Sequence, residues 1–216
     1  MLNAAGRMRR LIDDLLTLSR VTTQQRPFSR VDLDILVREV LSDLEVRITQ
    51  SGGIVDLGDL PTVDADPTQM RQLFQNLIVN AVKFHRPGVR PVVAIGGELV
   101  STPVGKSEDE QTRLFCRVSV RDNGIGFDEK YRDRIFEVFQ RLHGKDDYEG
   151  TGIGLAICRK IVERHGGTIT AHSKEGQGAT FVVKLPVRQP LTHEVNTEDV
   201  HPAQTYHDSD GRRRPG

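Results

Sequence analysis

The sequence predicts a mixed α/β domain that follows one long amphipathic helix. Three segments with helical periodicity, at about 33–50, 67–84 and 155–165, alternate with short apolar runs of the strand type. The chain has 216 residues, which is enough for one ordinary domain and an appendage. The runs expected to form strands are 54–57, 62–63, 91–99, 114–121, 168–173 and 179–185.

The first helix is expected from Leu2 to about Val21. Apolar residues recur there with a/d spacing, and charged residues take the opposite face. A lone helix of this length with so apolar a face needs a partner. That partner is either its own domain or another helix of an intermolecular bundle, and we favour the bundle. The apolar residues are Met8, Leu11, Ile12, Leu15, Leu16 and Leu18.

Two glycine clusters suggest a nucleotide site. The run 122–126 reads DNGIG and the run 150–154 reads GTGIG, the second leading into a helix at Leu155. Free N–H groups at a helix start favour phosphate, and Asp122 at a strand end can accept from an amine such as that of adenine. Either cluster alone could be an ordinary turn with a helix cap. Neither cluster fits the dinucleotide fingerprint or the Walker A pattern.

The helix at 67–84 supplies a third element. Asn76, Asn80 and Lys83 are spaced by four and three, so they share one stripe away from the apolar arc. Asparagine is a poor residue inside a helix, but its oxygen suits Mg²⁺. Lys83 can meet a phosphate as a point charge. The alternative is a solvated polar face.

In this order the motifs resemble the ATP-binding domain of bacterial sensor histidine kinases. They match its N box (76–84), G1 box (122–126), F box (136–139) and G2 box (150–154), and the stretch from Gly176 to Phe181 matches its last glycine motif. The resemblance covers about residues 1–186. The run FQRLHGKDDYEGTGIGLAICRKIVERHGG is most similar to phytochrome-type and related PAS-linked kinases.

The resemblance implies a Bergerat-type α/β sandwich (an α+β fold), with a mixed sheet covered on one face by the three helices. It assigns residues 1–25 to the second helix of the dimerisation and phosphotransfer hairpin. Residues 26–186 would be the catalytic domain, and 187–216 a disordered tail.

The resemblance also implies roles for single residues. Asn80, assisted by Asn76, would hold Mg²⁺, and Asp122 would select the adenine of ATP. Asn76, Lys83 and Arg141 are the candidate catalytic residues, with Phe136 and Phe139 anchoring a lid at 127–149 that carries Lys145. The other expected cofactor-binding residues are Gly124, Gly126, Gly150, Thr151, Gly152, Gly154, Leu155 and Thr180.

The sequence departs from the family pattern in one respect. The first hairpin helix is missing, and no histidine here fits the phosphoacceptor, so we expect no self-phosphorylation at the usual histidine.

We expect a homodimer through the N-terminal helix of the full-length protein, and a response regulator receiver domain as partner. The alternatives are a non-catalytic ATP-binding and dimerisation module, or an ATPase of the gyrase, HSP90 or MutL type. Such ATPases carry a glutamate where Asn76 stands.

The composition of the chain limits the kinds of partner that the protein is expected to bind. The formal net charge is zero, which implies no broad basic field for nucleic acid. No apolar run approaches about 18 residues and no signal peptide is present, so no membrane contact is expected. Cys116 and Cys158 have no metal-like spacing, and two buried reduced thiols fit a cytoplasmic protein.

Overall fold

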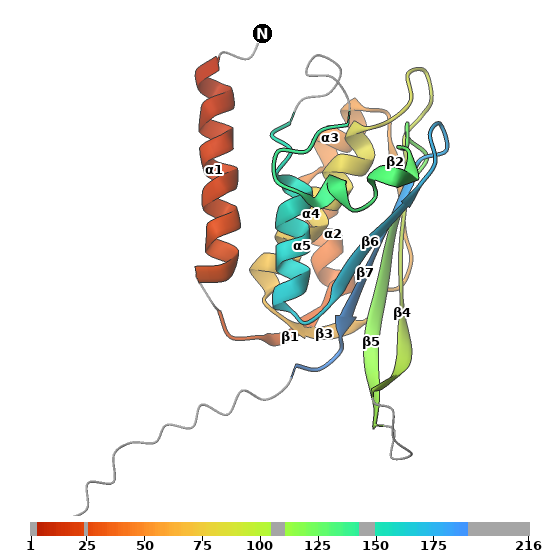
Figure 1. The fold of residues 1–216 in the computed structure, drawn as a ribbon. Helices are drawn as coiled ribbons and strands as arrows, with labels where there is room; N and C mark the ends of the chain where they lie inside the picture. Colours follow the sequence, from red (N-terminus) through yellow and green to blue (C-terminus); the bar gives the residue numbers. More distant parts are fainter. Residues whose placement is uncertain (1–3, 24–25, 105–110, 143–149, 190–216) are drawn as a thin grey trace, which may run out of the picture.

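A layer of helices packs against one face of a five-stranded sheet, and one further helix lies beside that layer (Figure 1). The computed structural model describes residues 4–23, 26–104, 111–142 and 150–189. The helices are α1 (Ala4–Thr23), α2 (Leu33–Asp43), α3 (Glu45–Gln50), α4 (Pro67–Lys83) and α5 (Gly154–Arg164), with short 3-10 turns η1 (Glu129–Tyr131) and η2 (Arg134–Phe136). The strands are β1 (Ser29–Asp32), β2 (Ile54–Leu57), β3 (Thr62–Ala65), β4 (Val92–Val104), β5 (Gln111–Asp122), β6 (Thr168–Ser173) and β7 (Ala179–Pro186).

The sheet is mixed, as predicted. Its strand order is β2-β4-β5-β7-β6, in which β2 pairs with β4 in parallel and every other pair is antiparallel. Strands β1 and β3 form a separate antiparallel ribbon. Only one face of the large sheet is covered by helices (Figure 1), an arrangement typical of antiparallel strands.

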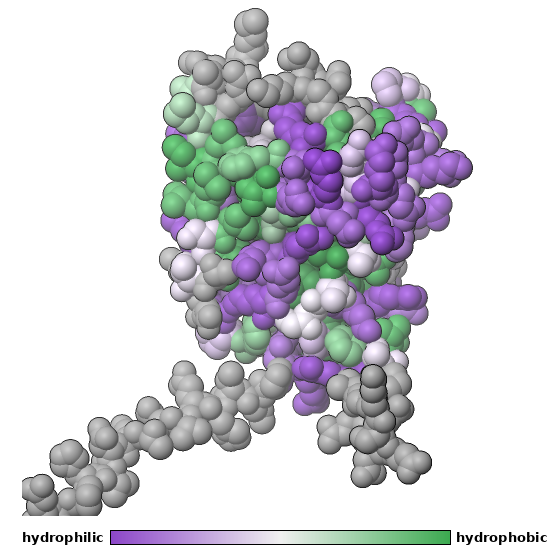
Figure 2. All heavy atoms as spheres, in the orientation of Figure 1, coloured by the Kyte–Doolittle hydropathy of each residue, from purple (hydrophilic) through white to green (hydrophobic). Residues whose placement is uncertain are grey.

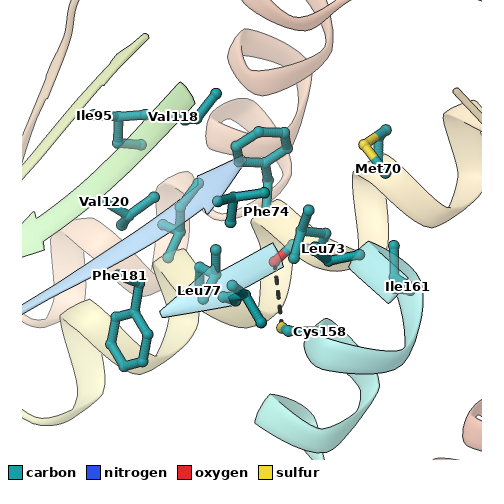
Figure 3. Close-up of a cluster of buried hydrophobic side chains, with 14 of the residues drawn as sticks. Met70, Leu73, Phe74, Leu77, Ile95, Val118, Val120, Cys158, Ile161 and Phe181 are labelled. Atoms are coloured by element: carbon teal, nitrogen blue, oxygen red, sulfur yellow. Dashed lines mark hydrogen bonds between the residues drawn. The ribbon is translucent and has the colours of Figure 1, made fainter. Parts of the chain in front are cut away.

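Helix α4 lies at the centre of the core. Asp66 caps it by accepting hydrogen bonds from the backbone N–H groups of Thr68 and Gln69, and proline follows at the first helical position. Its apolar arc packs against β4 and β5 (Figure 3). Each fully buried side chain of this arc contributes about 1.5–3 kcal/mol to stability. The arc comprises Met70, Leu73, Phe74, Leu77 and Ile78, all without exposed surface.

Three local predictions need correction. The single helix expected over 33–50 is interrupted at Leu44, whose buried side chain stays in the core while α3 turns away. The loop expected over 101–111 is shorter, because β4 and β5 continue as a hairpin to the pair Val104 and Gln111. Strand β1 was not predicted at all.

Helix α1 is the predicted amphipathic helix, and it packs against α5. Leu11 and Leu18 contact the core and Val21 is buried. The rest of its apolar stripe is exposed and gathers into one hydrophobic area of the surface (Figure 2). Within the described residues, none of the helices combines the length and apolarity needed to cross a bilayer. The exposed stripe comprises Met8, Ile12, Leu15 and Leu16.

The packed chain continues past the expected boundary at Pro186. Val187 is buried, and its backbone bonds both Leu114 and Asp64. The side chain of Gln189 donates to the carbonyl oxygen of His165 at 2.9 Å. The tail predicted to be disordered lies, from residue 190, outside the described residues.

Candidate nucleotide-binding site

Asp122 lies at the end of β5 and is only 8% exposed. Its Oδ1 accepts hydrogen bonds from the backbone N–H groups of Gly124 at 2.8 Å and Ala179 at 3.1 Å. Burial raises the pKa of Asp122, and these two hydrogen bonds oppose the increase. Among the described residues, nothing hydrogen-bonds to its Oδ2. That oxygen is therefore available to accept a hydrogen bond from a ligand amine.

The glycines around Asp122 allow backbone segments to approach one another. A Cβ atom placed on Gly124 would lie 2.2 Å from the carbonyl oxygen of Phe84. One placed on Gly178 would lie 2.0 Å from the carbonyl oxygen of Asp122. The sequence analysis included Gly178 only as a member of the last glycine motif. In the structure, its lack of a side chain lets the backbone at this position pack directly against that of Asp122. Contact of Gly124 and Gly126 with a nucleotide stays a prediction.

The stripe on α4 contains two asparagines in different states. Asn76 is engaged at both ends: its Oδ1 accepts from Gln72 at 3.1 Å, and its Nδ2 donates to the carbonyl oxygen of Gly154 at 3.2 Å. The half-buried side chain of Asn80 makes no hydrogen bond within the described part of the chain. Asn80 therefore has the freer oxygen for a cation, while Asn76 ties α4 to the start of α5.

Lys83 brings the end of α4 next to the second glycine cluster. Its Nζ lies 2.9 Å from the place that a Cβ on Gly150 would take. It also lies over the ring of Phe84, 4.1 Å from the centroid. An ammonium group thus adjoins the loop that leads into α5.

Helix α5 starts at Gly154 with no side-chain cap at Ile153. Its first N–H groups are the groups that an anion can satisfy. The side chain of Leu155 packs against the core. At the start of α5, the part of Leu155 available to a ligand is therefore its backbone. The hydroxyl of Thr151 donates a hydrogen bond to the carboxylate of Asp14 on α1, and its contact with a nucleotide stays a prediction.

The F-box phenylalanines have different environments. Phe136 is buried and meets Phe181 edge-on, with ring centroids 6.3 Å apart. Phe139 is 57% exposed with a φ of 66°, and its N–H donates to the carbonyl oxygen of Gly152 at 3.1 Å. The expected apolar anchoring by Phe139 is therefore wrong: its backbone makes the attachment.

Arg141 and Thr180 complete the predicted set. Arg141 is exposed, and its Cγ lies 3.2 Å from the position of a Cβ on Gly152, so it adjoins the second glycine cluster. Thr180 alternates along β7 with the buried residues Ala179 and Phe181, which places it on the opposite face of the sheet from the helices. Lys145 lies outside the described residues.

Other features of the described residues lie away from these motifs. A cavity of about 370 Å³ occupies the uncovered face of the sheet, between Gly96, Arg117 and Val182. The described part of the chain contains no cluster of three His, Cys, Asp or Glu side chains suited to a metal. A cation at the candidate site would therefore depend on amide oxygens, phosphates and water.

Comparison with known families agrees with this geometry. Residues 65–189 match the family described as histidine kinase-, DNA gyrase B- and HSP90-like ATPase. This stretch runs from the last residue of β3 to the last described residue and includes each of the glycine, asparagine and phenylalanine motifs discussed above.

Curated relatives include a phytochrome and a phytochrome-like protein. The chain is 48% identical over 180 residues to cyanobacterial phytochrome A of Nostoc sp. strain PCC 7120, covering 83% of the chain. It is 42% identical over 180 residues to the phytochrome-like protein Cph1 of Synechocystis sp. strain PCC 6803, again covering 83% of the chain. The chain spans only 22% of the length of either relative.

Solved structures show the same fold. The nucleotide-free catalytic domain of histidine kinase ThkA superposes with a TM-score of 0.57 at 29% identity, over 76% of this chain and 100% of that one. Full-length ShkA in complex with AMPPNP gives a TM-score of 0.64 at 28% identity, over 84% of this chain and 36% of that one.

Proposed function

Because the chain belongs to the family of histidine kinase-, DNA gyrase B- and HSP90-like ATPases, we propose that it is the ATP-binding catalytic part of a sensor histidine kinase. It would transfer the γ-phosphate of ATP to a histidine supplied from outside the described residues. The observation that carries this proposal is Asp122, a buried carboxylate with one oxygen fixed by two backbone amides and the other open to an adenine amine.

The roles of the other residues follow from their positions. Asn80 offers an amide oxygen to Mg²⁺, which would bridge phosphate oxygens and offset their charge. Lys83 and Arg141 supply positive charge near Gly150 and Gly152. Asn76 contributes mainly by holding α4 against α5. The protein's contribution to phosphoryl transfer is then positioning and charge stabilisation.

Asn76 also favours a kinase over an ATPase. A glutamate at this point in the gyrase, HSP90 and MutL types activates water, whereas an amide cannot act as a general base. We expect slow ATP hydrolysis, and substantial hydrolysis that Asn76→Ala abolishes would contradict this. A non-catalytic ATP-binding module would bind ATP but fail to phosphorylate a supplied hairpin domain.

For partners, we propose a second copy of the chain and a response regulator receiver domain. The exposed stripe of α1, which includes Met8, Ile12 and Leu16, is the surface that a helix bundle would cover (Figure 2).

We also propose a cytoplasmic location, because Cys116 and Cys158 are buried free thiols. Burial raises the pKa of each thiol to about 12, which keeps both unreactive.

Calorimetry of ATP binding with and without Mg²⁺ tests the proposed function. We expect Mg²⁺ to strengthen binding by the wild type, and Asn80→Ala to lose this Mg²⁺ dependence. Gln75→Ala, an exposed amide on the same helix, is the matched control and should retain it. Absence of ATP binding by the wild type would contradict the proposal.

A further inference from the structure

Residues 26–28, the described part of the connecting segment between α1 and β1, are held by one arginine at the end of α5. Arg164 pairs with the Oδ2 of Asp66 at 3.1 Å, and its side chain is only 13% exposed. Its Nη2 donates to the carbonyl oxygen of Arg26 at 2.8 Å. Its guanidinium also lies over the ring of Phe28, 5.1 Å from the centroid. One planar group thus binds the connecting segment, α5 and the start of α4.

These contacts lead directly to the candidate site. Asp66 is the cap of α4, the helix that carries Asn80 and Lys83. Its backbone N–H donates to the Nε2 of His165, and the ring of His165 lies 4.7 Å from that of Phe28. The connecting segment is therefore attached to the two helices that frame the phosphate end of the site.

Helix α1 has a second contact further along its length. The hydroxyl of Thr151, in the second glycine cluster, donates to the carboxylate of Asp14. Asp14 lies about 14 Å along the helix axis from Thr23, at a rise of about 1.5 Å per residue. Since a helix moves as a rod, a small rotation at its C-terminal end carries Asp14 away from Thr151. The contact of Asp14 with Thr151 therefore depends on the angle of α1.

Where α1 meets α4, one buried side-chain oxygen has no hydrogen-bond partner among the described residues. Gln69 is buried and donates from Nε2 to the carbonyl oxygen of Val21 at 3.4 Å. Its Oε1 is buried, and within the described residues it has no hydrogen-bond partner. An unpaired buried oxygen costs free energy, and that cost disappears when water reaches it. The position of α1 is secured by its apolar contacts with α5 and the core, and the contacts of Arg164 hold the residues that follow its C-terminal end.

We propose that Arg164 is a positioning residue that fixes the angle between α1 and the nucleotide site. A phosphoacceptor helix paired with α1 would then meet ATP at the distance that this angle sets. The role in phosphotransfer rests on the proposed function, whereas the effect on α1 requires no nucleotide.

Distance measurements between two spin labels test this role in the full chain without nucleotide. Labels at Arg9→Cys on α1 and Thr170→Cys on β6 occupy exposed positions, while the two native cysteines are buried. Dilution with unlabelled chain removes distances between copies. We expect one narrow distance in the parent protein, and its loss in Arg164→Ala. Lys160→Ala, an exposed cation one turn earlier on α5, should keep the narrow distance.

ATP affinity distinguishes a positioning role of Arg164 from a general destabilisation of the fold. We expect Arg164→Ala to bind ATP within about twofold of the parent, a difference of about 0.4 kcal/mol in binding free energy. An unchanged narrow distance, or an affinity that falls together with the melting temperature, would overturn the proposal. If Arg164→Ala does not fold, Phe28→Ala decides, because it leaves the pair of Arg164 and Asp66 intact. Failure of the parent to bind ATP contradicts the proposed function alone.

Discussion

The two ends of the candidate site are held by different kinds of contact. At the Asp122 end, the carboxylate is fixed by backbone amides and the loops are sealed by backbone against backbone. At the Thr151 end, one backbone hydrogen bond from Phe139 to Gly152 is joined by side-chain contacts from α1 and α4, including those of Asp14 and Asn76. Moving the Asp122 loops would disrupt several close backbone contacts at once, whereas single side-chain contacts can exchange one at a time. We therefore expect the base end to be the more rigid of the two, and the phosphate end to respond to the position of α1.

Substitution of Gly178 should have the largest effect on stability. Its φ is +81°, and a Cβ would lie 2.0 Å from the carbonyl oxygen of Asp122. We expect Gly178→Ala to lower the free energy of unfolding by about 3 kcal/mol or more, because backbone must move. Gly176→Ala in the same turn is the control: its φ is +75°, but nothing lies within 4 Å. It should cost about 1 kcal/mol, and equal losses in urea unfolding would show that the close approach is unimportant.

His165 should make stability depend on pH. Burial lowers its pKa, and the neutral ring accepts from Asp66 at Nε2 while Nδ1 lies 2.7 Å from the carbonyl oxygen of Ile161. Because the folded pKa lies below the unfolded value of about 6.5, this stabilisation is complete above that pH. It is lost as the pH falls, by at most about 1.4 kcal/mol per unit.

Urea unfolding between about pH 7.5 and 5.5 measures this loss. His165→Gln keeps an acceptor for the Asp66 amide but cannot titrate, so its stability should change less over this window. His172→Gln, at an exposed position, should behave like the wild type. A wild-type slope that survives in His165→Gln would assign the pH dependence to other groups.

Asp14→Ala should have the smallest effect on stability, at about 0.5 kcal/mol, because it removes one contact at the surface of α1. Removing a carboxylate from the phosphate end should leave ATP affinity unchanged or raise it slightly, more so at low salt. Asp13→Ala, its exposed neighbour, is the control for net charge. A loss of ATP affinity specific to Asp14→Ala would indicate that α1 helps to build the site.

The sequence predicted those parts that depend on local periodicity. The apolar arc of α4 and its stripe of Asn76, Asn80 and Lys83 follow from 3.6-residue spacing, and the structure has both. The break at Leu44 could not be predicted, because no glycine or proline marks it. The pair of Asp14 and Thr151 and the contacts of Arg164 join residues far apart in the chain, so no local pattern reveals them.

Nucleotide selectivity tests the central claim most directly. Inosine triphosphate carries a carbonyl oxygen where ATP carries its exocyclic amine, and a carboxylate oxygen can accept only from the amine. Calorimetry should show that the wild type prefers ATP by about tenfold or more, and that Asp122→Asn loses this preference. Asp133→Asn, at an exposed carboxylate, should retain it. Equal affinities of the wild type for the two nucleotides would contradict the role of Asp122 in reading the base.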